Sequence, residues 1–225
     1  MKRHLILFFI SLLPLLAMSQ GVITRSVKKP QPQKQAGISK PTGSINGHGY
    51  VDLGLSVKWA TCNVGASSPS EYGGYYAWGE ITTYTENTRT NYKTYMKDID
   101  NIEGNPQYDV ARAKWGGSWR LPTKAECEEL RDKCTWKWST QGGHKGCIVT
   151  SKINGKSIFL PTAGERFDTQ LNYVGMQGRY WSSTLNKDEN FVAYNLYFHN
   201  IPSEKKYDVS WSSLNTGFSI RPVTE

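Results

Sequence analysis

The chain has 225 residues, of which 38% are hydrophobic and 12% aromatic, with 21 glycines and 10 prolines. A chain of this size and apolar content can bury one sizeable core, which excludes collagen-like, coiled-coil and wholly disordered proteins. The formal charge of +8 does not indicate nucleic-acid binding, because the excess is confined to residues 1–47 and the remainder carries a net +1; phosphate binding needs a clustered basic face.

The first 47 residues predict an export signal and a linker. Two basic residues, Lys2 and Arg3, precede a 13-residue apolar run, Leu5–Ala17, and small residues follow it. This pattern is typical of a secretory signal peptide over residues 1–19, and the run is too short for a transmembrane helix. Residues 20–47 are basic, rich in proline and glycine, and without aromatics, so we expect a flexible linker. The single domain then spans residues 48–225.

Two short helices are predicted among many short strands. Residues Tyr50–Ala60 alternate as a strand pair that turns at Gly54. A short helix is expected over Asp109–Trp115. A second is expected over 124–134, because Thr123 and Glu126 form a capping box and Pro122 disfavours helix before them.

The C-terminal half is expected to be a run of antiparallel strands, with a tight turn at Asn154-Gly155 between the first two. The expected strands are Cys147–Lys152, Ser157–Leu160, Tyr180–Thr184, Phe191–Phe198 and Phe218–Pro222. Helices and strands segregated in this order indicate an α+β fold.

The segment Ile81–Gln107 is a long polar loop that contains Tyr84, Tyr92 and Tyr95. Loops of this length in compact domains are usually functional or disordered. Trp136 and Trp138 alternate around Lys137 just after the second helix, so in an extended segment both indoles face one side. Most tryptophans are expected in the core, but an exposed indole or these tyrosines are candidates to stack on sugars or anchor a partner.

Six segments together resemble the Fibrobacter succinogenes major paralogous domain family, over about Tyr50–Val223. They are Trp59–Ala66, Tyr72–Glu80, Trp119–Thr123 with Glu126, Ser157–Gly164, Arg179–Thr184 and Ser219–Val223. The resemblance implies a C-type-lectin-like fold with short antiparallel strands, two short helices and long loops, distantly similar to formylglycine-generating enzymes. The family is common in exported proteins of Bacteroidota and has no firmly assigned activity.

The four cysteines, Cys62, Cys127, Cys134 and Cys147, indicate disulfides in an exported protein. Cys127 and Cys134 lie roughly 10 Å apart along the predicted helix, too far to bond. Two connectivities remain, and the resemblance favours Cys62 with Cys134, which leaves Cys127 and Cys147 bonded or free. A zinc site from these residues and His144 is not expected, because no tight Cys-x2–4-Cys pair is present.

No motif for catalysis or for calcium-dependent sugar binding is evident, so we expect no enzyme activity, cofactor or metal. The reactive cysteines of the related enzymes would lie near the C-terminus, where this chain has none. Glu165 and Asp168 suit an exposed turn better than a catalytic pair, and Asp188-Glu189-Asn190 suits a polar turn between strands.

The sequence therefore predicts an exported, non-catalytic binding module, acting in the periplasm, at the outer surface or in the medium, and adhering to a glycan or an extracellular protein. Two alternatives stay open: a structural subunit of a surface appendage or envelope assembly, and a divergent enzyme on the formylglycine-generating fold.

Overall fold

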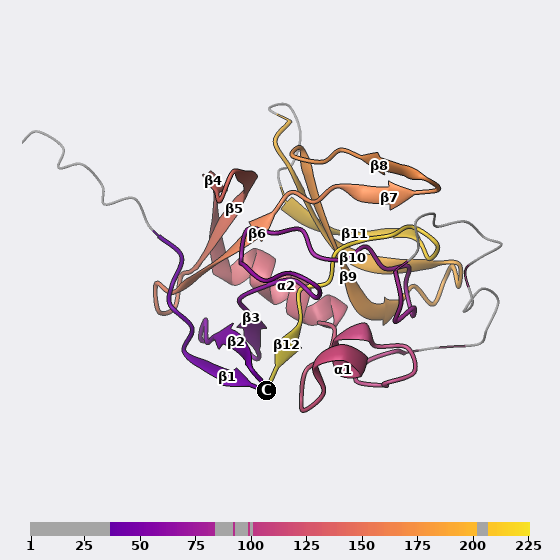
Figure 1. Cartoon of the computed structure of the whole chain (residues 1–225), viewed down its shortest axis with the longest axis horizontal. Coiled ribbons are helices and arrows are strands. Elements are labelled where there is room, and N and C mark those ends of the chain that lie inside the picture. The colour runs from indigo at the N-terminus through magenta and orange to yellow at the C-terminus, as the bar shows by residue number, and fades with distance from the viewer. Residues whose placement is uncertain (1–36, 84–91, 93–98, 100, 202–206) are drawn as a thin grey trace, which may run out of the picture. The chain divides into compact units, whose positions relative to one another are not determined.

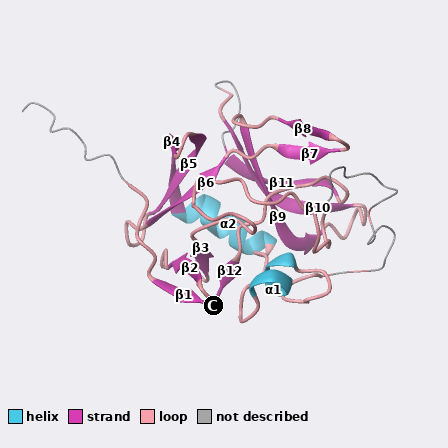
Figure 2. Cartoon of the chain, in the orientation of Figure 1, coloured by secondary structure: helices cyan, strands magenta, loops and turns pink. Residues whose placement is uncertain are grey.

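In a computed structural model the described residues are 37–83, 92, 99, 101–201 and 207–225, and within them the chain is mostly antiparallel strands with two short helices (Figures 1 and 2). This agrees with the predicted α+β class. The helices are α1 (Val110–Trp115) and α2 (Lys124–Lys133). The strands are β1 (Gly43–Ile45), β2 (His48–Val51), β3 (Lys58–Ala60), β4 (Cys134–Gln141), β5 (His144–Ser151), β6 (Ser157–Pro161), β7 (Glu165–Phe167), β8 (Gln170–Asn172), β9 (Gln177–Leu185), β10 (Val192–His199), β11 (Tyr207–Ser213) and β12 (Val223–Thr224).

The strands form four small sheets. Their orders are β1-β2-β3-β12, β4-β5-β6, β11-β10-β9 and the hairpin β7-β8, and every pairing between these strands is antiparallel. Helix α2 packs against β9, β10, β11 and β4, so it lies between two of the sheets (Figure 1). None of the helices in the described ranges has the length and apolarity to cross a bilayer.

Both predicted helices are confirmed, together with the capping box of α2. The Thr123 hydroxyl accepts a hydrogen bond from the Glu126 amide at 3.2 Å, and the Glu126 carboxylate accepts one from the Thr123 amide at 2.8 Å. These bonds satisfy amides that have no partner in the first turn of a helix. Helix α1 begins after Asp109, whose side chain accepts bonds from two amides of that turn.

Glu126 also binds Arg120, which predicts that helix α2 is sensitive to acid. Burial raises the pKa of the Glu126 carboxyl, but hydrogen bonds from Arg120, at 2.7 and 2.9 Å, and from the Thr123 amide outweigh it, so the pKa lies below its usual value. A carboxyl whose pKa is lower in the folded state than in the unfolded state stabilises the fold at pH values above the unfolded pKa of about 4.3. This stabilisation is lost as the pH falls through the folded pKa.

We therefore expect Glu126→Gln to lower the free energy of unfolding by about 1–3 kcal/mol at neutral pH, since the charged hydrogen bonds are lost. The deficit should be smaller at pH 3 than at pH 5, because the unfolded carboxyl takes up its proton near its pKa of about 4.3 and the stability from the lowered folded pKa declines below it. Urea denaturation at both pH values measures it, with Glu128→Gln as the control, because its carboxylate is partly exposed and pairs with Lys124 at 3.8 Å. A deficit that is the same at both pH values would contradict this account.

The strand predictions are confirmed except at the C-terminus. Strands β2 and β3 form the opening pair, with Gly54 at φ 71° between them, and β5, β6, β9 and β10 lie close to their predicted ranges. The expected strand Phe218–Pro222 is wrong. Phe218 bridges Tyr76, Ser219 bridges Tyr180, and only Val223–Thr224 form a strand. Phe218 and Ser219 pair with different segments, the Ile220 and Pro222 carbonyls accept bonds from the Val64 and Ala60 amides, and Pro222 has no amide hydrogen to donate, so no continuous ladder forms.

Two smaller predictions differ from the structure. The β5–β6 connection is a five-residue loop, 152–156, in which Gly155 has φ 72° and the Asn154 side chain accepts a bond from the Lys156 amide, rather than a two-residue turn. The fold also begins before residue 48, since β1 pairs with β2 and the Ser39 amide donates to the Ser157 carbonyl at 3.1 Å. The predicted signal peptide and residues 20–36 of the linker lie outside the described residues.

Two buried clusters form the core. One gathers α2 with strands β2 to β6 and β9 to β12, and the other gathers α1 with Trp78, Trp119 and Trp181. Five of the eight tryptophans are at most 8% exposed, whereas Trp211 is 53% exposed, as expected for a residue type that is mostly used in cores. Arg221 is also fully buried, at the junction of three chain segments.

Candidate functional site

A pocket of about 420 Å³ opens beside the β4–β5 hairpin. Its walls come from the end of that hairpin, from the segment between β8 and β9, and from the residues that follow β10. The lining residues are Trp138, Ser139, Thr140, Lys145, Gly175, Met176, Gln177, Asn200 and Ile201. The volume is within the range of small-molecule sites.

The hairpin places Trp138 at the pocket because β4 is extended. Trp136 and Trp138 are two residues apart on the strand, and both contact the core residue Phe198. Their ring centroids lie 5.4 and 6.0 Å from the centroid of the Phe198 ring. The prediction that both indoles face one side is thus confirmed. Trp136 is also stacked on Tyr207 at 5.5 Å, so its ring lies between two aromatic neighbours, while Trp138 lines the pocket.

Backbone hydrogen bonds fix the opposite wall. The Gly175 amide donates to the Thr162 carbonyl at 2.8 Å, and the Met176 and Gln177 amides both donate to the Tyr173 carbonyl at 3.0 Å. Gln177 pairs with His199 in the β9–β10 ladder. The pocket therefore has a rigid frame, which is what a preformed binding site requires.

The third wall follows β10. The His199 ring nitrogen Nδ1 accepts a hydrogen bond from the Ile201 amide at 3.1 Å, which turns the chain and brings Asn200 and Ile201 to the pocket. Sequence reasoning identified Trp138 but missed Lys145, Gln177 and Asn200. Their sequence neighbourhoods carry no signal, because only the pairing of β4 with β5 and of β9 with β10 brings them together.

Of the three tyrosines in the long loop, the structure describes only Tyr92, which does not line this pocket. Tyr84 and Tyr95 lie outside the described residues. Tyr92 is 5% exposed, and its hydroxyl donates to the Trp78 carbonyl at 2.8 Å. Tyr92 therefore belongs to the core, and its ring does not offer the open face that sugar stacking needs.

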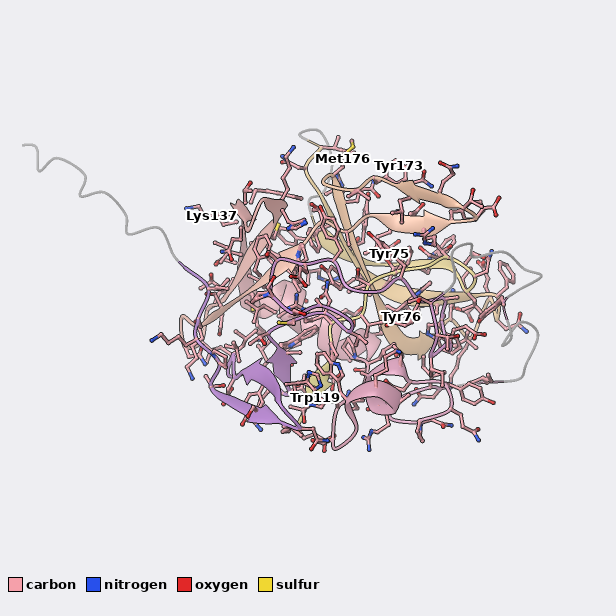
Figure 3. All side chains as sticks on the ribbon, viewed as in Figure 1. Tyr75, Tyr76, Trp119, Lys137, Tyr173 and Met176 are labelled. Carbon is pink, nitrogen blue, oxygen red and sulfur yellow. The ribbon has the colours of Figure 1, made fainter. Side chains whose placement is uncertain are left out.

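Exposed apolar side chains lie on the β7–β8 hairpin and on residues 173–176, which lead from it to the pocket. Met176 is one of them and also lines the pocket, and Figure 3 shows it near Tyr173 at the upper edge of the picture. The exposed apolar side chains of this hairpin surface are Phe167, Leu171, Tyr173, Val174 and Met176, between 39% and 57% exposed. Phe167 pairs with Gln170 and Leu171 with Arg166, so these two side chains lie on opposite faces of the hairpin. Exposed large apolar residues can mark interaction surfaces.

Glu165 and Asp168 have structural roles in the same hairpin. Glu165 forms an ion pair with Arg179 at 3.2 Å, and Asp168 occupies the turn with φ 54°. The predicted turn is therefore confirmed for Asp168 and wrong for Glu165, which begins strand β7 and is only partly exposed.

Cys62, Cys127 and Cys134 are free thiols in the structure, and Cys147 is buried in the same cluster as Cys127 and Cys134. The expected Cys62–Cys134 bond is therefore not formed here. Burial raises the pKa of Cys127, and it raises the pKa of Cys134 to about 12, so both stay protonated and unreactive near neutral pH. Within the described ranges, no three His, Cys, Asp or Glu side chains gather as metal ligands.

The other titratable groups with shifted pKa values belong to structural networks. Burial raises the pKa of Tyr75 to about 12, and its hydroxyl donates to the Ala163 carbonyl at 2.6 Å. Burial likewise raises the pKa of Tyr76 to about 12. Asp109 and Glu126 bind backbone amides at helix starts. Each of these shifts thus has a cause in the fold.

In comparisons with protein-family models, with curated proteins and with solved structures, none matches the chain.

Proposed function

We propose that this chain is an exported, non-catalytic binding module that recognises a glycan in the Trp138 pocket, on a C-type-lectin-like domain. The observation that carries the proposal is a half-buried indole lining a pocket together with hydroxyl and amide side chains. An aromatic face packs against the C–H groups of a sugar ring, while hydroxyls and amides can hydrogen-bond its hydroxyl groups.

The size and lining of the pocket support a small carbohydrate unit. About 420 Å³ accommodates roughly one or two sugar rings, since drug-sized ligands occupy about 300–1,000 Å³. Ser139, Thr140, Gln177 and Asn200 offer both donors and acceptors, as a sugar hydroxyl needs. The leader and basic linker read from the sequence support export, and the resemblance supports the fold type.

Replacing Trp138 with Ala is expected to abolish stacking and weaken glycan binding by about 2 kcal/mol, or roughly 30-fold, as for an aromatic anchor in a pocket. A glycan array identifies ligands of the mature domain, and calorimetry then compares the variants. Asn200→Ala should also weaken binding while leaving stability unchanged, because this residue lines the pocket and is exposed.

Trp211→Ala is the matched control, because Trp211 is 53% exposed and does not line the pocket. Its affinity should equal that of the wild type. The proposal would be rejected if Trp138→Ala and the wild type bound the array ligand with equal affinity. It would also be rejected if the domain captured proteins and no glycans, and that result would favour a protein ligand.

A structural subunit is the second candidate, and the hairpin surface supports it. Five large apolar side chains are exposed on the β7–β8 hairpin and on residues 173–176 after it, and an assembly would cover them. The mass of the mature chain in solution by light scattering distinguishes the two functions, since an assembling subunit gives multimers and a binding module gives monomers. The divergent enzyme stays a prediction from the resemblance alone.

A further inference from the structure

Lys145 brings a positive charge to the Trp138 pocket. Within the described part of the lining, Lys145 is accompanied by aromatic, apolar, hydroxyl and amide side chains, and by no carboxylate. None of the ion pairs formed among the described residues includes Lys145. Its ammonium is therefore available to a ligand.

The backbone of Lys145 is held in place, so the side chain starts from a fixed point. The Lys145 carbonyl accepts hydrogen bonds from both the amide and the hydroxyl of Thr162, at 2.9 and 2.8 Å. Thr162 itself is fully buried. Across the hairpin Lys145 pairs with Thr140, and paired residues of antiparallel strands share a face. Lys145, Thr140 and Trp138 thus belong to one face of the β4–β5 hairpin.

The neighbouring cation at the start of β9 is already neutralised. Arg179 pairs with Glu165 at 3.2 Å and lies over the Tyr197 ring, with its guanidinium carbon 4.3 Å from the ring centroid. Among the described residues Lys145 has no such partner, so no carboxylate of this part of the chain compensates its charge. A negative group on the ligand would complement it, and charge-assisted hydrogen bonds are stronger than neutral ones.

We propose that the ligand of this pocket is an acidic glycan, in which a sugar carboxylate pairs with Lys145 while the ring stacks on Trp138. This inference rests on the proposed glycan-binding function and narrows its ligand class. A hexuronate residue has the required chemistry, because it places a carboxylate on an otherwise neutral ring that is rich in hydroxyl groups.

The test uses a panel of oligohexuronates and their carboxyl-reduced neutral counterparts, which differ in the charged group alone. Calorimetry with the mature chain should give at least tenfold tighter binding of an acidic member than of its reduced form. This preference should shrink between 50 and 500 mM salt, because salt screens a partly exposed charge pair. Lys145→Gln should remove the preference, so that the acidic and the reduced members bind with equal affinity.

Lys137→Gln is the matched control. Lys137 is exposed and precedes Trp138 on β4, so its side chain projects from the opposite face of the strand. This variant should keep the full preference for the acidic member.

The outcomes separate this inference from the function on which it rests. Equal binding of acidic and reduced members, lost in Trp138→Ala, overturns the acidic ligand and retains the glycan site. A preference that survives Lys145→Gln also overturns the role of Lys145. Binding of no panel member, or binding unaffected by Trp138→Ala, counts against glycan recognition itself.

Discussion

Replacing Arg221 with Met is expected to lower the free energy of unfolding by about 4 kcal/mol or more, because it leaves several buried oxygens without a donor, each worth about 1–3 kcal/mol. Arg221 is fully buried. Its guanidinium donates to the Ala60, Thr61 and Phe159 carbonyls at 3.0, 2.7 and 3.0 Å and to the Asn63 side-chain oxygen at 2.8 Å. One side chain thereby joins the end of β3, strand β6 and the C-terminal segment.

The loss would be a large share of a domain stability of about 5–15 kcal/mol, so urea denaturation should show a clear shift of the midpoint. Arg221→Lys should recover little, since one ammonium cannot reach acceptors arranged around a planar fork. If Arg221→Met does not fold, Asn63→Ala offers a milder change, because it removes one of the four acceptors of Arg221, together with the bonds that the Asn63 amide donates to the Tyr72 and Glu71 carbonyls at 2.9 and 3.4 Å. Lys187→Met, at an exposed position, is the control and should stay within about 0.5 kcal/mol of the wild type. A wild-type midpoint for Arg221→Met would contradict the role given to Arg221.

Local signals in the sequence were sufficient for the helices and for most strands. The capping box at Thr123 and Glu126 is formed within four residues, and the alternation of Trp136 and Trp138 depends only on the strand period. Such features are encoded by neighbours in the chain, so their prediction does not need the tertiary structure.

The features that failed or were missed depend on distant partners. The expected strand at Phe218–Pro222 has a suitable composition, but its residues bind Tyr76, Tyr180 and, through Arg221, the Ala60 carbonyl. These partners lie far along the chain, and no short-range pattern identifies them. Tertiary pairing of this kind overrides local strand preference.

The candidate site likewise contains one residue predicted from the sequence and several that depend on distant pairing. Trp138 was identified because exposed or half-buried aromatics are common in binding sites, whereas Lys145, Gln177 and Asn200 are ordinary polar residues by sequence. They become a site only because β5, β9 and the end of β10 meet beside the indole. The tyrosine proposal was wrong for Tyr92, because an aromatic residue in a polar loop can fold back onto the core, as its bond to the Trp78 carbonyl shows.

Replacing Asp109 with Ala is expected to lower the free energy of unfolding by about 3–5 kcal/mol, since four backbone amides, two of them in fully buried bonds, lose their acceptor at once. Asp109 is fully buried. One carboxylate oxygen accepts from the Ala111 and Arg112 amides at 2.9 and 3.1 Å, and the other accepts from the Gly104 and Leu121 amides at 2.8 and 2.9 Å. The residue thus caps α1 and also ties it to the loop before it and to the segment before α2.

The two oxygens of Asp109 make a graded test possible. Asp109→Asn keeps one acceptor oxygen for the amides of α1, but its NH₂ group faces two N–H donors, so its cost should lie between those of the wild type and the Ala variant. Urea denaturation measures the order of stability among the wild type, Asp109→Asn and Asp109→Ala.

Hydrogen exchange adds a local readout, because the Gly104 and Leu121 amides should lose protection in both variants. The Ala111 and Arg112 amides should lose protection fully in Asp109→Ala alone. Asp188→Ala, at an exposed turn position, is the control. If Asp109→Asn proved as destabilising as Asp109→Ala, the carboxylate would be acting as one unit, and the separate roles assigned here to its two oxygens would be wrong.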